Sequence, residues 1–201
     1  YEPLGKLYPV TSSGRRMALA RWLTDAQHPR TSRVAVNHIW LRHFGEGLVP
    51  SVADFGLHGK PPSHPELLDW LAIELIDNGW QMKHLHRLLV LSTTYRMTSA
   101  TVAGRSNQQI DRDNRFLWRM NYRRMEAEVV RDSILSTAGM LDTTPGGPDL
   151  DQTLCDKIPR RSMYFRTTPD DKMEFLELFD LADPNACFRR AVSVIPQQAL
   201  A

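Results

Sequence analysis

Histidines and carboxylates surround a long connector in the first half of the chain, and residues of these types could bind a metal ion. Imidazole and carboxylate are the ligands that Zn²⁺ or Fe²⁺ would use. His38 and His43 would be about 140° apart on a helix, which is not the i, i+4 geometry of a helical metal pair. Only tertiary folding could assemble such a site. In the structural alternative, scattered histidines form hydrogen bonds, His43 packs against Trp40 and His58 is solvated. The candidate ligands are His43, Asp54, His58, His64 and Glu66.

A second group of charged residues recurs at helical spacing further along the chain. Glu128 follows Arg124 by four residues and precedes Arg131 by three, so both guanidinium groups are within helical reach of its carboxylate. If exposed, these residues form structural pairs worth a few tenths of a kcal/mol each. In the alternative, the arginines clamp a bound carboxylate or phosphate. We expect Glu128 to orient both arginines, which in turn hold Asn37 or a backbone carbonyl across the helix interface. The candidate polar face consists of Arg33, Asn37, Arg124, Glu128, Arg131 and Asp132.

Motifs of nucleophilic catalysis are absent from the sequence. There is no GxSxG elbow, and neither Cys155 nor Cys187 has a histidine at a recognised motif spacing. Catalytic residues therefore stay unassigned. The two cysteines cannot form a thiolate metal site by themselves. The sequence leaves open whether they form a disulfide or remain two free thiols.

Helices on both sides of the connector, residues 45–62, must position the candidate ligands. The connector has no regular period but carries large apolar residues, so we expect it to be ordered and packed across the neighbouring helices. Trp40 and Phe44 lie where two apolar faces of the preceding helix overlap, and they are predicted core residues. Gly45 occupies the C′ position of that helix. The Ser63–Glu66 segment has the pattern of a capping box for the next helix.

Apolar periodicity predicts four helices in this half of the chain. The first is capped by Ser12 or Ser13 and ends before Pro29, because the residue preceding a proline leaves the α region. Its inward stripe consists of Leu19, Trp22, Leu23 and Ala26. The other three are expected over residues 33–44, 65–79 and 82–92.

The second half mixes helices with turn-rich segments. A long helix is expected over residues 123–139, with Ala127, Val130, Ile134 and Ala138 facing inward. Residues 162–167 have the content of a short strand, which needs a partner such as residues 191–195. A short helix is expected over residues 172–179. The segment from Pro196 looks like the start of a helix that continues beyond the last residue.

Together these elements predict a mainly α fold. The expected arrangement is one antiparallel, bundle-like helical domain over residues 1–201, with long ordered connectors and at most a small two- or three-stranded sheet. Small polar residues at 98–107 mark either a loop or an internal boundary near 98–110.

Composition excludes several classes of protein. Hydrophobic residues at 42% and charged residues at 24% are typical of a globular chain. A net charge of +2 is too small to indicate a nucleic-acid partner. No apolar run approaches the roughly 20 residues of a transmembrane helix. The sequence begins without Met or a signal-peptide pattern, so we expect an excised domain or a mature start.

Six collinear motifs cover nearly the whole chain. They are RRMALARWLTD, RVAVNHIWLRHFGEGLV, DFGLHGKPPSHPELLDWLA, LLVLSTTYRMTS, YRRMEAEVVRDSIL and SVIPQQALA. Together they resemble the DUF1553 domain, also called PSD1, of large planctomycete-type proteins. The resemblance implies an exported multidomain protein, periplasmic or extracellular, in which this domain follows a DUF1549 domain and often a cytochrome c domain. This chain has no CxxCH motif, so a c-type haem is expected only on a neighbouring domain.

Two functions are consistent with these observations. The first is a helical accessory or binding domain whose surface around the connector docks a neighbouring domain of the same polypeptide, a carbohydrate or another small molecule. The second is a metal-assisted hydrolase or oxidoreductase with a divalent metal near the connector. Metal content would distinguish them.

Overall fold

Two units make up the chain, residues 1–122 and residues 123–201. The computed structural model describes residues 13–100, 105–185, 190, 193 and 196–199. Within these residues the regular structure is helical, and strand pairing is limited to isolated bridges. The fold is therefore mainly α, as predicted. The division between the units follows Tyr122, beyond the 98–110 segment where the composition changes; a single domain over the whole chain stays a prediction.

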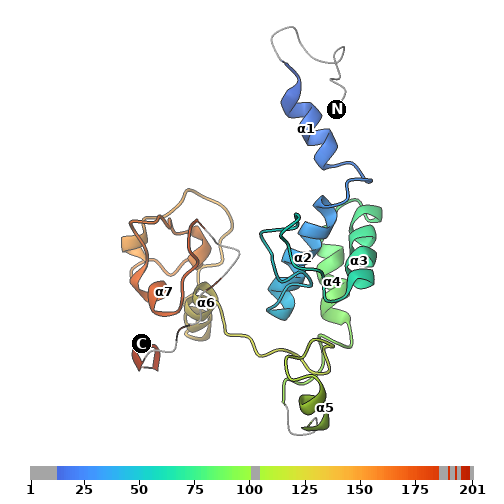
Figure 1. Ribbon diagram of the computed structural model, residues 1–201. Coiled ribbons are helices and arrows are strands. Elements are labelled where there is room, and N and C mark those ends of the chain that lie inside the picture. The colour runs from blue at the N-terminus through green and yellow to red at the C-terminus, as the bar shows by residue number, and fades with distance from the viewer. Residues whose placement is uncertain (1–12, 101–104, 186–189, 191–192, 194–195, 200–201) are drawn as a thin grey trace. The chain divides into compact units, whose positions relative to one another are not determined.

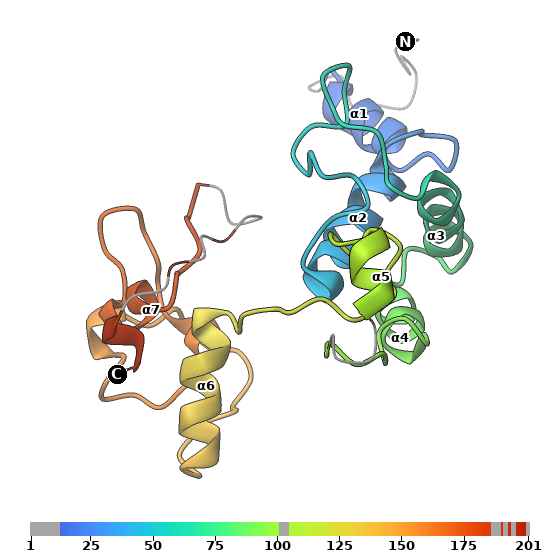
Figure 2. The same ribbon diagram turned by 60° about the horizontal axis from the view of Figure 1, so that its bottom comes forward.

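The first unit is built around α2, as its two apolar faces predict. In Figures 1 and 2 the connector lies on one side of α2, and α3 and α4 lie on the other. Trp40 is only 6% exposed and Phe44 only 1%, which confirms both as core residues. The helices of this unit are α1 (Arg15–Leu23), α2 (Thr31–Phe44), α3 (Pro65–Asp77), α4 (Met82–Leu91) and α5 (Arg105–Ile110). The core also contains Val36, Leu68, Leu71, Leu75, Leu85 and Leu89.

The ends of α2 and α3 follow local sequence signals, with one correction. Gly45 has a φ of 83° and its N–H donates to Leu41 O, as expected of a glycine after a helix. Pro65 begins α3, but the predicted capping box is wrong: His64 precedes the helix and no side chain caps it. The Ser63 hydroxyl is instead 2.9 Å from His64 Nδ1, so it does not accept a hydrogen bond from the first turn.

The first predicted helix is shorter than its sequence pattern and does not bury its stripe. α1 ends at Leu23, where the Thr24 hydroxyl donates to Ala20 O and competes with the helical hydrogen bonds. Leu19 and Trp22 are more than half exposed in the described structure. The prediction that this apolar stripe faces inward is thus wrong, and Ala18 is the buried residue of this helix.

The connector is anchored near its start by a buried asparagine. Asn37 is fully buried on α2; its Nδ2 donates to Val49 O at 3.1 Å and its Oδ1 accepts from Val49 N–H at 2.8 Å. Leu48 and Val49 are buried, whereas Leu57 is fully exposed. A Cβ at Gly47 would lie 2.7 Å from Val49 O, so only glycine fits between these groups. The packing expected of the connector is therefore confirmed near α2 and wrong at Leu57.

The second unit packs α6 against α7 and a set of 3-10 turns. Its core contains Ala127, Phe165, Met173 and Leu176. The helical elements are α6 (Ala127–Thr137), η1 (Gln152–Leu154), η2 (Ser162–Tyr164), α7 (Glu174–Leu178) and η3 (Pro196–Ala199). The predicted start of α6 at residue 123 is wrong, because the helix begins at Ala127. None of the described helices has both the length and the apolar character needed to cross a membrane.

Two further expectations for the second unit are corrected. Ile134 on α6 and Ala138 just after it are exposed, and Arg131 is buried in their place. The predicted strand at 162–167 is a 3-10 turn followed by one parallel bridge between Phe165 and Leu150. Leu150 N–H donates to Tyr164 O, and Arg166 N–H donates to Leu150 O, each at 2.8 Å. The suggested partner, residues 191–195, lies mostly outside the described residues.

Candidate functional site

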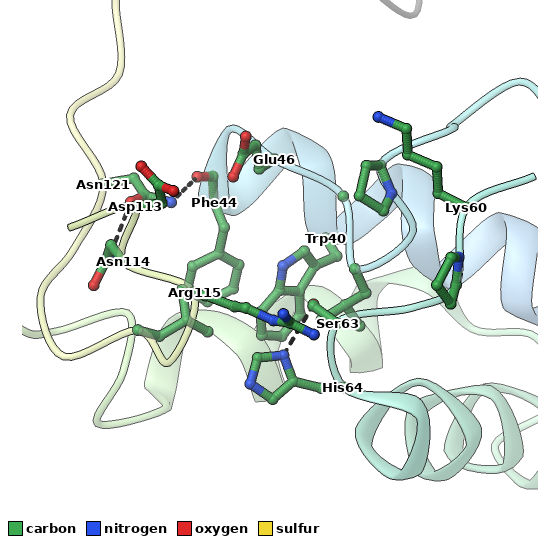
Figure 3. A pocket seen from close by; sticks show the side chains of 15 residues that line it. Trp40, Phe44, Glu46, Lys60, Ser63, His64, Asp113, Asn114, Arg115 and Asn121 are labelled. Carbon is green, nitrogen blue, oxygen red and sulfur yellow. Dashed lines mark hydrogen bonds between the residues drawn. The ribbon is translucent and has the colours of Figure 1, made fainter. Parts of the chain in front are cut away.

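A cavity of about 370 Å³ lies beside the connector in the first unit (Figure 3). We call it the connector cavity. Its walls come from the end of α2, both ends of the connector, the two residues that follow the connector, and the loop at residues 113–121. The lining residues are Trp40, Phe44, Glu46, Gly47, Leu48, Pro50, Lys60, Pro61, Ser63, His64, Asp113, Asn114, Arg115, Leu117 and Asn121.

The floor of the connector cavity is aromatic. Trp40 and Phe44 are four residues apart on α2, so they share one face of the helix. Their ring centroids are 4.0 Å apart, with an interplanar angle of 20°. Both rings are mostly covered by the surrounding core. The cavity therefore offers a small apolar contact rather than a broad aromatic surface.

One wall is shaped by two asparagines that sequence reasoning missed. Asn114 is 2% exposed and has a φ of 55°, a conformation that Asn adopts more readily than most residues. Its Nδ2 donates to Arg119 O and to Asn121 Oδ1, each at 2.8 Å. Asn121 Nδ2 then donates to Phe44 O at 2.9 Å. Polar residues in a loop predict a turn, but nothing in the sequence predicts its attachment to α2.

Charged side chains of both signs lie around the opening. Glu46, Lys60, Asp113 and Arg115 are exposed. Within the described ranges, none of these four forms an ion pair. His64 is half-buried, and its Nδ1 is hydrogen-bonded to the adjacent Ser63 hydroxyl. The cavity thus combines an apolar floor with charges that are not neutralised by neighbouring side chains.

The predicted histidine and carboxylate set is not brought together. His64 lines the connector cavity, whereas His43 Nε2 is 2.7 Å from His86 Nδ1 on α4. Asp54 accepts a hydrogen bond from Gly56 N–H and shapes a turn, and His58 and Glu66 are exposed. Among the described residues, no group of three or more His, Cys, Asp or Glu could hold a metal ion. A divalent metal stays a prediction.

His38, the other histidine of α2, does not join this set. Burial, together with the nearby Arg42 charge, lowers its pKa below the usual histidine value. Its imidazole is therefore neutral over a wider pH range than a solvated histidine.

The residues of the predicted polar face do not form one group, because they lie in both units and have separate contacts. Arg33 and Asn37 lie in the first unit, where Arg33 Nε is 2.6 Å from Asp69 Oδ1. In the second unit, Glu128 pairs with Arg190 at 2.8 Å rather than with Arg124 or Arg131. That expectation is wrong for Arg124 because α6 begins only at Ala127. It is wrong for Arg131, which keeps the helical spacing, because its guanidinium donates to backbone carbonyl groups instead.

Arg124 has its own partner, whereas Arg131 and Asp132 both contact Ser162. Arg124 pairs with Asp180 at 3.1 Å. The buried Arg131 guanidinium donates to three carbonyl oxygens, those of Cys155, Ile158 and Arg160. Asp132 accepts hydrogen bonds from the N–H and the hydroxyl of Ser162. Arg131 is therefore a structural centre of the second unit, since its donors are occupied by the chain itself.

The cysteines do not suggest a nucleophile. Burial, reinforced by the neighbouring Asp156 carboxylate, raises the pKa of the Cys155 thiol, so less of it is thiolate at neutral pH. Cys187 lies outside the described residues, so whether the two form a disulfide stays open.

Comparison with known proteins identifies the family. The model of the PSD1 family, described as a protein of unknown function (DUF1553), matches residues 15–201, and the chain belongs to this family. No curated protein and no solved structure matches the chain.

Proposed function

We propose that this member of the DUF1553 family is an accessory domain that binds a small organic ligand in the connector cavity. The cavity itself carries the proposal. Its volume is in the range typical of small-molecule sites, which are concave, mostly apolar and lined by a few polar groups. Trp40 and Phe44 supply the apolar contact, and charged residues at the opening supply groups that could orient a ligand.

A compact ligand fits better than a carbohydrate. Sugars are commonly held by stacking on a broad aromatic face, and Trp40 keeps only 6% of its surface exposed. Carbohydrate binding, the other ligand class expected from the sequence, would need more of that ring.

The cavity favours binding over catalysis. Ser63 and His64 are within hydrogen-bond distance, as a nucleophile and its base must be. A working dyad also needs a third group that orients the histidine. No described residue forms a hydrogen bond or an ion pair with His64 Nε2. The pair is therefore better suited to contact a ligand than to activate a hydroxyl.

The wider setting of the domain follows from its family resemblance. We propose that it belongs to an exported planctomycete-type protein, periplasmic or extracellular, and that it docks a DUF1549 or cytochrome c domain of the same polypeptide. A c-type haem would then be held by that neighbour. Co-purification of separately produced domains would test the docking.

Ligand binding can be tested by nuclear magnetic resonance with a library of small organic molecules. We expect some of them to shift the Trp40 indole and the Asn114 and Asn121 side-chain amide signals. Ser63→Phe should fill the cavity and abolish these shifts. Thr93→Phe, at an exposed position of the same unit that does not line the cavity, is the matched control. If no compound shifts these signals, or if Ser63→Phe binds like wild type, the proposal is wrong.

The metal-assisted enzyme is tested separately. Protein purified without chelator should contain metal in stoichiometric amount if the function is metal-assisted hydrolysis or oxidoreduction. Folded protein without metal would favour the binding domain.

A further inference from the structure

The geometry points to an organic monocarboxylate as the ligand of the connector cavity, with Arg115 as the residue that binds its carboxylate group. This inference rests on the proposed function, because it names the ligand class of the same site. Three observations support it: the fixed backbone of Arg115, its unpaired guanidinium group, and the apolar floor over which that group extends.

The backbone of Arg115 is held in place without help from its side chain. Its N–H donates to Asp111 Oδ1 at 2.9 Å, and the following N–H of Phe116 donates to Asp111 Oδ2 at 2.8 Å. The preceding Asn114 is buried and fixed by hydrogen bonds to the rest of the loop. The loop thus presents Arg115 at the cavity in a defined position and leaves its side chain available.

The Arg115 guanidinium has no partner in the part of the chain that the structure describes. It forms no ion pair and no side-chain hydrogen bond there. The Arg124 and Arg131 guanidinium groups are instead held by their own unit. An arginine presents a planar fork of donors that matches a carboxylate in two parallel hydrogen bonds. The N–H donors of Arg115 at the cavity therefore suit a ligand that carries a carboxylate group.

The surroundings of Arg115 favour a carboxylate attached to an apolar group. Figure 3 shows its side chain extending across the cavity towards Ser63 and His64, in front of the ring of Trp40. A carboxylate bound there would contact the apolar floor on one side in place of water, and an ion pair is stronger in such surroundings than in bulk solvent. The Ser63 hydroxyl, which is hydrogen-bonded to His64 Nδ1, also lies on that wall.

The other charges at the opening limit the ligand to a single negative charge. In Figure 3 Lys60 points away from the aromatic floor, so Arg115 is the cation directed into the cavity. Glu46 and Asp113 also line the opening, and both would repel a second negative charge. A phosphate ester or a dicarboxylate is therefore a poorer match than a monocarboxylate.

The inference is tested with phenylacetate and its neutral isostere phenylacetamide, titrated into the isotopically labelled full chain. We expect phenylacetate to bind at least about tenfold more tightly than phenylacetamide, since a hydrogen bond to a charged group is lost with the amide. Arg115→Gln should weaken phenylacetate binding about 10- to 100-fold. Arg115→Lys should retain part of the affinity, because it keeps the charge and loses the fork.

The matched control is Arg112→Gln. It removes the same charge from an exposed position just before the 113–121 loop that does not line the cavity. The affinity of this variant for phenylacetate should equal that of wild type. Equal affinities for phenylacetate and phenylacetamide, or an unchanged affinity in Arg115→Gln, would overturn the carboxylate assignment. If Ser63→Phe still abolished the binding of both compounds, the proposed ligand site would stand. If neither compound shifts a signal of a cavity residue, the carboxylate assignment is wrong. The proposed function is wrong as well only if no compound of the wider library shifts such a signal.

Discussion

Asn121 Nδ2 donates a hydrogen bond to Phe44 O at 2.9 Å, joining residues 77 positions apart in the sequence. Phe44 is the last residue of α2, and carbonyl groups at the end of a helix have no partner within it. The same bond therefore satisfies the helix end and attaches the loop that forms one wall of the connector cavity. One side chain therefore contacts both the end of α2 and the wall of the cavity.

Replacing Asn121 by alanine should destabilise the first unit by about 1–3 kcal/mol. The change removes the bonds to Phe44 O and to Asn114 Nδ2, both of which are part-buried. Urea unfolding of wild type and variant measures the difference. Asn107→Ala, at an exposed position of α5, is the control and should have a much smaller effect. Equal midpoints for Asn121→Ala and wild type would show that the loop is held by other contacts.

Trp40→Ala should lower the free energy of unfolding by about 3–5 kcal/mol, through lost burial and the space left behind. Trp40 is 6% exposed and stacked on Phe44. Trp70 is 49% exposed on α3, so Trp70→Ala should cost far less in the same denaturant experiment. A similar loss for both variants would contradict the assignment of Trp40 to the core.

Amide hydrogen exchange should divide the connector into slow and fast parts. The Val49 N–H donates to the buried Asn37 Oδ1, and the Ser63 N–H donates to Leu48 O, so both should exchange slowly. Leu57 and His58 are exposed and should exchange fast. Asn37→Ala should accelerate exchange at Val49 while leaving His58 unchanged. Uniformly fast exchange from Gly45 to Pro62 would show that the connector is not anchored.

The sequence predicted what depends on near neighbours along the chain. Apolar spacing identified α2, α3 and α4, and the overlap of two faces placed Trp40 in the core. Gly45 and Pro65 marked helix ends because their backbone preferences are local. The same patterns failed for Leu19 and Trp22, since periodicity shows which face is apolar and not what covers it.

The site depends on contacts that no local pattern encodes. The partner of Asn121 is at the end of a distant helix, and Glu128 meets Arg190, 62 residues away. Helical spacing favoured Arg124 and Arg131 for Glu128, but Arg124 precedes the start of α6 at Ala127, and Arg131 donates to backbone carbonyl groups instead. Of the five residues proposed as ligands, His64 alone lines the cavity. Pairings of this kind follow from tertiary packing.

Asp180→Asn should weaken the second unit at neutral pH and have little effect in acid. Burial alone would raise the pKa of Asp180, but hydrogen bonds from Ser193 and the Arg124 charge lower it overall. A lowered folded-state pKa contributes stability above the unfolded value of about 3.9. That stability is lost as the pH falls through the folded-state pKa. Asn suits the φ of 61° at this position, so the backbone should be preserved.

Unfolding measured across the acid range tests this difference. Asp183→Asn, at an exposed carboxylate nearby, is the control. If the gap between Asp180→Asn and wild type is the same at neutral and at acid pH, the charge of Asp180 is not what stabilises the unit.

A crystal structure of the chain soaked with small organic acids tests the central claim most directly, because it locates the ligand. We expect density in the connector cavity, in contact with Trp40 and with a carboxylate against Arg115, and we expect it to be absent from crystals of Ser63→Phe. The soak should use a ligand concentration that saturates binding in solution. If the ligand is then bound only at other positions and the connector cavity holds water, the claim is contradicted.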